Sequence, residues 1–245
     1  MRRWLREPIV DAMDEQPLPS GPVAALGSSY GALRAVVATV TDEHSWTPTA
    51  CVGWSVRDLV FHCLQDAQRG LVALHTPAQH PTDRDAVTYW EDWSPGGEGA
   101  ANGRRHARVS ASMFLHVEQL LDLYQETTGA VVHAARSTPP ETVVATQGHV
   151  LTAGDLMCTL AVEATIHHLD LAVSLPDAPG AAAAGLTEVR RVLDGMLGRQ
   201  APSTWDGARY ARTATGRATP SRPNRSGSAP TSPVYPCSAD QRACM

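Results

Sequence analysis

The chain has 245 residues, 43% of them hydrophobic, which is enough for a substantial core in one large domain or two small ones. Its 20 basic residues, all arginine, are outnumbered by 25 acidic ones, and the net charge of -5 excludes the electrostatic pattern of a nucleic-acid-binding protein. No apolar run reaches the roughly 18 residues of a membrane span, so we expect a cytoplasmic protein with neither a membrane nor a nucleic-acid partner.

The spacing of apolar residues predicts an all-α protein with four long helical segments. The first covers about 22–43. The second begins at a capping box, with Ser55 as N-cap and Asp58 as its reciprocal partner, and extends to about Leu74. A loop rich in proline and glycine follows over 76–103, and its aromatic residues suggest that it covers a pocket.

A third helix is expected over 105–127, followed by short β segments near 131–132 and 143–144. Thr152 and Asp155 form a second capping box, which starts the fourth helix and carries it to about residue 174. A shorter helix over 186–197 precedes the C-terminal part of the chain.

These segments suggest a division of the chain into four parts. We expect an N-terminal extension over 1–20, a helical bundle over 21–175, a C-terminal helix and extension over 176–217, and a tail over 218–245. Prolines recur through the tail among serine and arginine, so we expect it to be disordered.

The fourth helix carries two polar residues on a face that is otherwise apolar. Glu163 and His167 are four residues apart, so their side chains point in nearly the same direction. A carboxylate and an imidazole in an apolar environment need a partner, because burying an unpaired charge is costly. They either satisfy each other as an ordinary hydrogen-bonded pair or bind a metal.

His62, in the second helix, is the natural third ligand, because facing helices of a bundle present side chains to one shared site. Two imidazoles and one carboxylate are used by catalytic zinc sites, which keep one coordination position open. The same set suits non-haem Fe(II), but residue types favour zinc. The five cysteines form no C-x-x-C pair, which argues against a structural zinc knuckle. Cys63 and Cys158 are interpreted as small core residues.

Two separated stretches, WTPTACVGWSVRDLVFHCL and AVEATIHHLDLA, together resemble the metal-binding domain of the mycothiol-dependent maleylpyruvate isomerase family, part of the DinB-like superfamily. Thr49 and Cys51 are displaced slightly around Ala50. The other motif positions match, namely Gly53, Trp54, Ser55, Asp58, His62, Glu163, His167, Asp170 and Leu171. Ordinary DinB relatives carry histidine where this chain has Glu163, which favours the isomerase-like branch.

The resemblance covers roughly residues 22–215 and implies an up-down four-helix bundle with His62, Glu163 and His167 as metal ligands. It also implies a divalent metal, mycothiol as thiol cosubstrate and a small electrophilic molecule as substrate. The function expected from it is a metal-dependent isomerase or S-transferase, in which the metal activates the thiol. Characterised members have a folded C-terminal domain that residues 175–217 hardly match, so the isomerisation itself is left open, as is a homodimer.

The alternative is a metal-binding bundle without catalysis, serving a stress response or binding. That hypothesis predicts a closed site with a fourth protein ligand, for which His116 and Asp66 are the candidates. Asp170 is expected either to orient His167 from the outer shell or to be an ordinary polar helix residue. Arg69 is a candidate for binding an anionic substrate, although a solvated charged face is the simpler and favoured explanation. We expect His168 to face outward.

Overall fold

The computed structural model describes residues 21–91, 98–175 and 177–218, and within them it confirms the all-α prediction. The expected extension over 1–20 and the expected disordered tail, apart from Ala218, lie outside the described residues. None of the described helices is long and apolar enough to cross a membrane. The helices are α1 (Pro22–Val37), α2 (Asp42–Ser45), α3 (Val56–Leu74), α4 (Glu98–Ala111), α5 (Val117–Ser137), α6 (Ala153–Leu171), α7 (Ala183–Leu197) and α8 (Gly207–Ala214).

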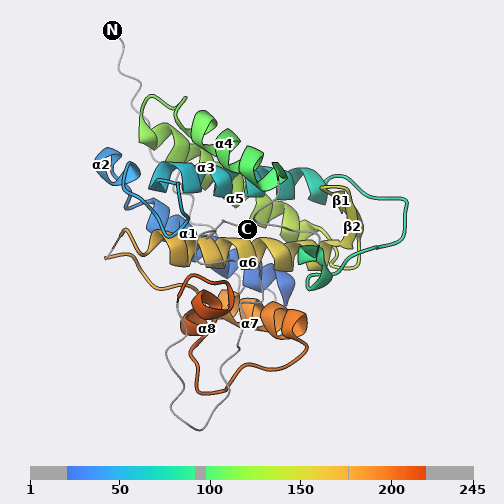
Figure 1. Cartoon of the computed structure of the whole chain (residues 1–245). Coiled ribbons are helices and arrows are strands. Elements are labelled where there is room, and N and C mark those ends of the chain that lie inside the picture. The colour runs from blue at the N-terminus through green and yellow to red at the C-terminus, as the bar shows by residue number, and fades with distance from the viewer. Residues whose placement is uncertain (1–20, 92–97, 176, 219–245) are drawn as a thin grey trace.

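Four of these helices, α1, α3, α5 and α6, form the bundle (Figure 1), with α1 packed mainly on α6 and α3 mainly on α5. The connection between α3 and α5 contains a 3-10 turn (Thr88–Trp90) and α4, which packs on α3. It brings the chain back to the start of α3, where Arg57 Nη2 donates a hydrogen bond to the carbonyl of Phe114, 3.1 Å away. The strands β1 (Val143–Thr146) and β2 (His149–Thr152) pair antiparallel as a hairpin, and α6 follows directly after β2.

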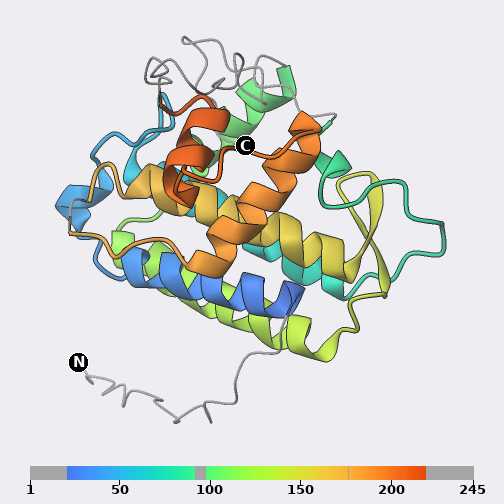
Figure 2. The ribbon, with the colours of Figure 1, turned by 90° about the horizontal axis from the view of Figure 1, so that it is seen from below.

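Helix α6 is the centre of the protein, because it is covered on two sides. One hydrophobic cluster fills the bundle between α1, α3, α5 and α6. A second joins the opposite face of α6 to α7 and α8, through residues such as Ile166, Val192 and Tyr210. Figures 1 and 2 show α7 and α8 on the side of α6 that faces away from α3 and α5. Every residue of α6 except Asp155 is consequently buried.

The capping box predicted at Ser55 and Asp58 is present, and Thr152 caps the start of α6, so both helices begin where the sequence predicts. The Ser55 amide and hydroxyl donate to Asp58 Oδ2 at 2.9 and 2.8 Å. In α6 the Asp155 amide donates to Thr152 Oγ1 at 3.0 Å. These contacts satisfy amide groups that a helix start leaves without partners.

The single helix predicted over 105–127 is wrong, because the chain breaks between α4 and α5. Its apolar spacing continues through Val109 and Met113, yet these side chains are 57% and 80% exposed. Both helices pack on α3, and the chain between them, over 112–116, is not helical. The β segment predicted near 131–132 is also wrong and belongs to α5, whereas the segment near 143–144 is part of β1. Helix α8 was not predicted.

Gly185 gives a test of the packing between α7 and the bundle. The hydroxyls of Ser29 in α1 and Thr165 in α6 lie 3.1 Å apart beneath it, and a Cβ at this position would overlap both oxygens. We predict that Gly185→Ala lowers the free energy of unfolding by about 1–3 kcal/mol, as overpacking does. Chemical denaturation measures this.

Gly31→Ala is the matched control, since Gly31 is an exposed residue of α1 with open space around its Cα. It should raise stability by about 0.5–1 kcal/mol, because alanine favours the helix. Equal effects of the two substitutions would contradict the packing described.

Candidate metal site

The structure brings the three predicted metal ligands together at the middle of the bundle. The imidazole rings of His62 in α3 and His167 in α6 lie 4.9 Å apart, nearly perpendicular to each other. Glu163 Oε2 is 3.1 Å from Nε2 of His167. The two helices run antiparallel here, so His62 meets residues one turn apart on α6, as the resemblance implied.

Asp66, one turn after His62, completes a group of four. One ligand atom from each of His62, Asp66, Glu163 and His167 can be chosen so that all lie within 4.8 Å of one another. Asp66 Oδ2 is 3.3 Å from Nε2 of His62. His116, the other candidate for a fourth ligand, is exposed at the N-cap of α5 and is not part of this group.

The site fits a divalent cation because its buried atoms lack other partners. Asp66 Oδ2, Glu163 Oε2 and His167 Nε2 are each buried without a hydrogen-bond partner among the described residues. Glu163 Oε2 and His167 Nε2 are 3.1 Å apart and contact each other as an ion pair. Unsatisfied buried polar atoms are rare in proteins. Oxygen and imidazole nitrogen atoms converging on one point are the donor set that zinc or iron takes.

The charges of the site depend on burial and on ion pairs. Burial lowers the pKa of His62, which favours a neutral imidazole able to bind a metal. Burial acts in the same direction on His167, but Asp170 and Glu163 outweigh it and raise its pKa to about 9. Burial would raise the pKa of Glu163, yet the neighbouring His167 holds it below its ordinary value. A divalent cation would therefore take the place of a proton on His167.

Asp170 makes the contact expected of an outer-shell partner. Its Oδ2 lies 3.1 Å from Nδ1 of His167, leaving Nε2 to face the site. The sequence analysis did not predict that Arg217 also contacts Asp170. Arg217 contacts Asp170 with Nε at 2.6 Å from Oδ1 and Nη2 at 3.0 Å from Oδ2. Despite its burial, Asp170 has a pKa of about 2, chiefly because of this guanidinium.

Arg217 links the C-terminal part of the chain to the metal site. It follows α8, and both it and Asp170 are almost fully buried. In the sequence, Arg217 stands at the edge of a stretch rich in Arg, Ser and Pro, and nothing there marks it as part of a site. Only the folded structure shows that it pairs with Asp170. Cys51 Sγ also lies 3.2 Å from Asp170 Oδ2, and Cys51, His167 and Asp170 form a second group whose possible ligand atoms all lie within 4.8 Å of one another.

Two other expectations have different outcomes. Arg69 Nη2 is 2.7 Å from Asp66 Oδ1 at the partly exposed side of the site, so its role toward a substrate stays a prediction. The expectation that His168 faces outward is wrong. The side chain is buried, with Nε2 at 2.8 Å from the carbonyl of Pro179. The reason is that α7 and the chain leading to it cover the face of α6 that would be exposed in a four-helix bundle alone.

A small cavity of about 10 Å³ lies behind the site. Tyr30 of α1 and Tyr124 of α5 line it together with Asp66, Glu163 and His167. Both tyrosine hydroxyls are buried without a hydrogen-bond partner among the described residues. Burial raises both tyrosine pKa values well above the ordinary one, so both hydroxyls remain protonated donors. All four bundle helices therefore direct polar groups to this region.

The fold is a helical bundle with a candidate metal site, and comparison with known proteins identifies the family. The model for the mycothiol maleylpyruvate isomerase N-terminal domain matches residues 26–172. The chain therefore belongs to the mycothiol-dependent maleylpyruvate isomerase family, as the resemblance indicated. No curated protein matches the chain significantly.

Two solved structures have a similar fold. One is a mutant of the mycothiol-dependent maleylpyruvate isomerase, with a TM-score of 0.55 and 15% identity over 80% of this chain and 88% of that one. The other is the mycothiol-dependent maleylpyruvate isomerase, with a TM-score of 0.49 and 18% identity over 70% of this chain. The chain spans 66% of the length of the latter. At these identities the likeness concerns the fold alone.

The pair between Arg217 and Asp170 gives a prediction about stability and metal affinity. Arg217→Ala leaves a buried carboxylate with one partner fewer, so we expect the metal-free protein to lose about 3–5 kcal/mol of unfolding free energy. We also expect metal affinity to fall roughly 10–100-fold, because Asp170 orients His167 less well. Denaturation and calorimetric metal titration measure the two effects.

The double variant Arg217→Ala with Asp170→Asn separates the ion pair from general damage. Without the carboxylate charge, the Arg217→Ala substitution should cost much less stability than it does alone. Additive losses would show that the two residues do not act as a pair.

Proposed function

We propose that the protein is a divalent-metal-dependent enzyme that uses mycothiol as an isomerase or S-transferase on a small electrophilic molecule. Membership of the family supports the use of mycothiol. The convergence of unsatisfied atoms from Asp66, Glu163 and His167 beside His62 is the observation that supports a metal. We propose His62, Glu163 and His167 as the metal ligands, zinc as the favoured metal, and the cytoplasm as the location.

A divalent cation at this position would favour the thiolate form of a thiol over the neutral thiol. The residues of the chain determine which side is open to it. His167 is fully buried, whereas the side chains of His62 and Glu163 are 18% and 10% exposed. The thiol therefore has access from the side of His62, where Arg69 is 32% exposed. Arg69 is placed to attract an anionic group once it arrives there.

The reaction proposed is the addition of the thiol to an activated double bond of the substrate. The sulfur adds to one carbon and a proton to the other, the resulting single bond rotates, and elimination restores the thiol and gives the isomer. An S-transferase would instead release the adduct as product. Asp170 and Arg217 keep the His167 ring in place throughout, since they hold Nδ1 on the side away from the opening.

Replacement of His62 tests the proposal. In His62→Ala we expect metal affinity to fall by more than the roughly 10–100-fold typical of outer-shell changes. We expect the thiol-dependent turnover of maleylpyruvate to fall as well. Elemental analysis of the purified protein and an assay with mycothiol measure the two. His133→Ala is the matched control, because His133 is exposed on α5 and should change neither. A His62→Ala protein that kept its metal and its turnover would reject the proposal.

The position of Asp66 supports a second candidate function. In that alternative the metal site is closed and non-catalytic, and the protein serves binding or a stress response. Asp66 Oδ2 lies within the ligand group, while Arg69 holds its Oδ1. A fourth protein ligand would occupy the position that a catalytic zinc leaves open.

Asp66→Asn decides between the two candidates. If three residues bind the metal, we expect this variant to retain it, with affinity lowered by no more than the roughly 10–100-fold typical of outer-shell changes. A far larger loss of affinity, together with a wild-type protein that shows no thiol-dependent turnover, would favour the closed site. Asp58→Asn, in which only the helix cap changes, is a control for stability.

A further inference from the structure

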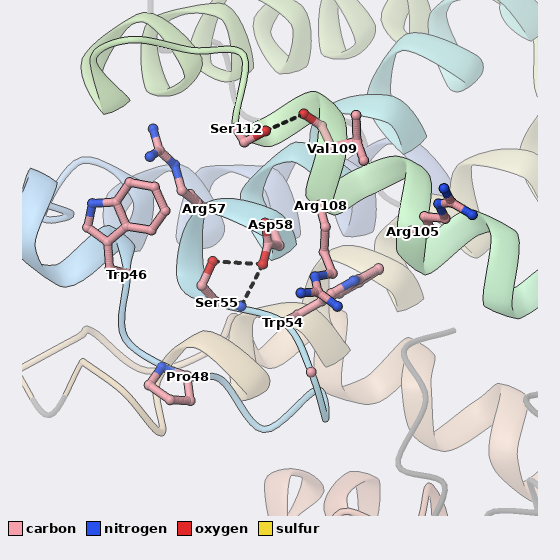
Figure 3. A pocket seen from close by; sticks show the side chains of 11 residues that line it. Trp46, Pro48, Trp54, Ser55, Arg57, Asp58, Arg105, Arg108, Val109 and Ser112 are labelled. Atoms are coloured by element: carbon pink, nitrogen blue, oxygen red, sulfur yellow. Dashed lines mark hydrogen bonds between the residues drawn. The ribbon is translucent and has the colours of Figure 1, made fainter.

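A second pocket, separate from the proposed metal site, lies at the start of α3 (Figure 3). Its volume is about 700 Å³, within the range of small-molecule sites. The loop before α3, the first turn of α3 and the last turns of α4 form its walls. None of the four residues of the candidate metal group lines it. The indole of Trp54 lines this pocket and has its ring 5.0 Å from that of His62, so it forms a wall between the two sites.

Positive charge dominates the walls of this pocket. Arg57, Arg105 and Arg108 line it, whereas Asp58 is the acidic residue among its lining residues. Asp58 is already engaged by the capping box with Ser55. Among the ion pairs within the described part of the chain, none involves any of the three arginines. The pocket therefore has an excess of positive charge in a protein whose net charge is -5.

Arg57 is the most informative of the three arginines, because it is only 3% exposed. Its guanidinium lies 4.1 Å from the ring centroid of Trp46, and its Nη2 donates to the Phe114 carbonyl. Its Nε is buried without a hydrogen-bond partner in the part of the chain described. A buried cation with a free donor is costly unless an anion pairs with it. The positive end of the α3 dipole lies at the same place and adds to the attraction.

The aromatic walls indicate what else the ligand contains. Trp46 is 59% exposed beside Arg57, so its ring is accessible to a ligand in the pocket. Figure 3 shows Arg108 extending from α4 toward Trp54, and Arg57 beside Trp46. The pocket thus offers guanidinium groups next to two indole rings, an arrangement suited to a charged group attached to a flat apolar one.

We propose that this pocket binds a small anionic molecule with a flat apolar part. Its carboxylate or phosphate group is attracted by Arg57 and Arg108, and its flat part packs against the indole rings of Trp46 and Trp54. Binding requires no metal, since the candidate metal ligands lie behind the Trp54 indole. The inference therefore stands apart from the proposed thiol chemistry and is tested by binding alone.

Calorimetry on the full chain tests the proposal with two probes of nearly the same shape, 2-naphthoate and the uncharged 2-naphthylmethanol. We expect 2-naphthoate to bind at least about tenfold more tightly, the effect of one charge-assisted hydrogen bond. Its affinity should be the same in protein treated with a chelator and in protein loaded with zinc. Inorganic phosphate should compete, which shows that the anionic group is what the arginines recognise. Equal affinity for the two probes, or binding only in the presence of zinc, would overturn the proposal.

Variants then locate the binding. Arg105→Gln with Arg108→Gln should weaken 2-naphthoate at least about tenfold, since both side chains are exposed and leave the fold unchanged. Arg57→Lys should weaken it similarly, because lysine lacks the planar donors. Arg136→Gln, at the exposed C-terminal end of α5, is the matched control and should bind as wild type. If Arg57→Lys does not fold, the double variant decides alone, and unchanged affinity in it would refute the site.

Discussion

The burial of α6 is the constraint on which the rest of the structure depends. A helix covered on both sides would ordinarily be apolar throughout, yet this one carries Glu163, His167, His168 and Asp170 in its interior. Each of these groups has a large desolvation cost, so each must have a partner or a ligand. His168 has the Pro179 carbonyl and Asp170 has Arg217. Glu163 and His167 instead direct atoms without hydrogen-bond partners toward His62.

The C-terminal helices take part in the site as well as in the fold. Because α7 and α8 cover the outer face of α6, the chain after α8 passes close enough for Arg217 to reach Asp170. That pair fixes the carboxylate that contacts His167. The segment after the bundle thus contributes to the candidate metal site as well as to the core. This coupling explains why stability and metal affinity should respond together to a change at Arg217.

The start of α3 connects the two sites proposed for this protein. The loop that carries Trp54 supplies the wall between the metal group and the arginine-rich pocket, and the cap at Ser55 and Asp58 fixes the first turn of α3 next to both. Arg57 also ties this turn to the connection before α5. A ligand in the pocket would therefore contact the same short segment that positions His62. The two sites differ in chemistry, since one offers carboxylates and imidazoles and the other offers guanidinium groups.

Local patterns in the sequence determined the starts of α3 and α6, the apolar face of α3 and the pairing of Glu163 with His167, because capping and helical spacing act within a few residues. Apolar spacing misled where a helix breaks, since Val109 in α4 and Met113 after it follow the pattern but remain exposed. Only the tertiary structure decided that His168 is buried, that Asp66 joins the ligand group and that Arg217 reaches Asp170. Each of these depends on which helix covers which face, and contacts between residues as distant as 170 and 217 leave no periodic signal in the chain.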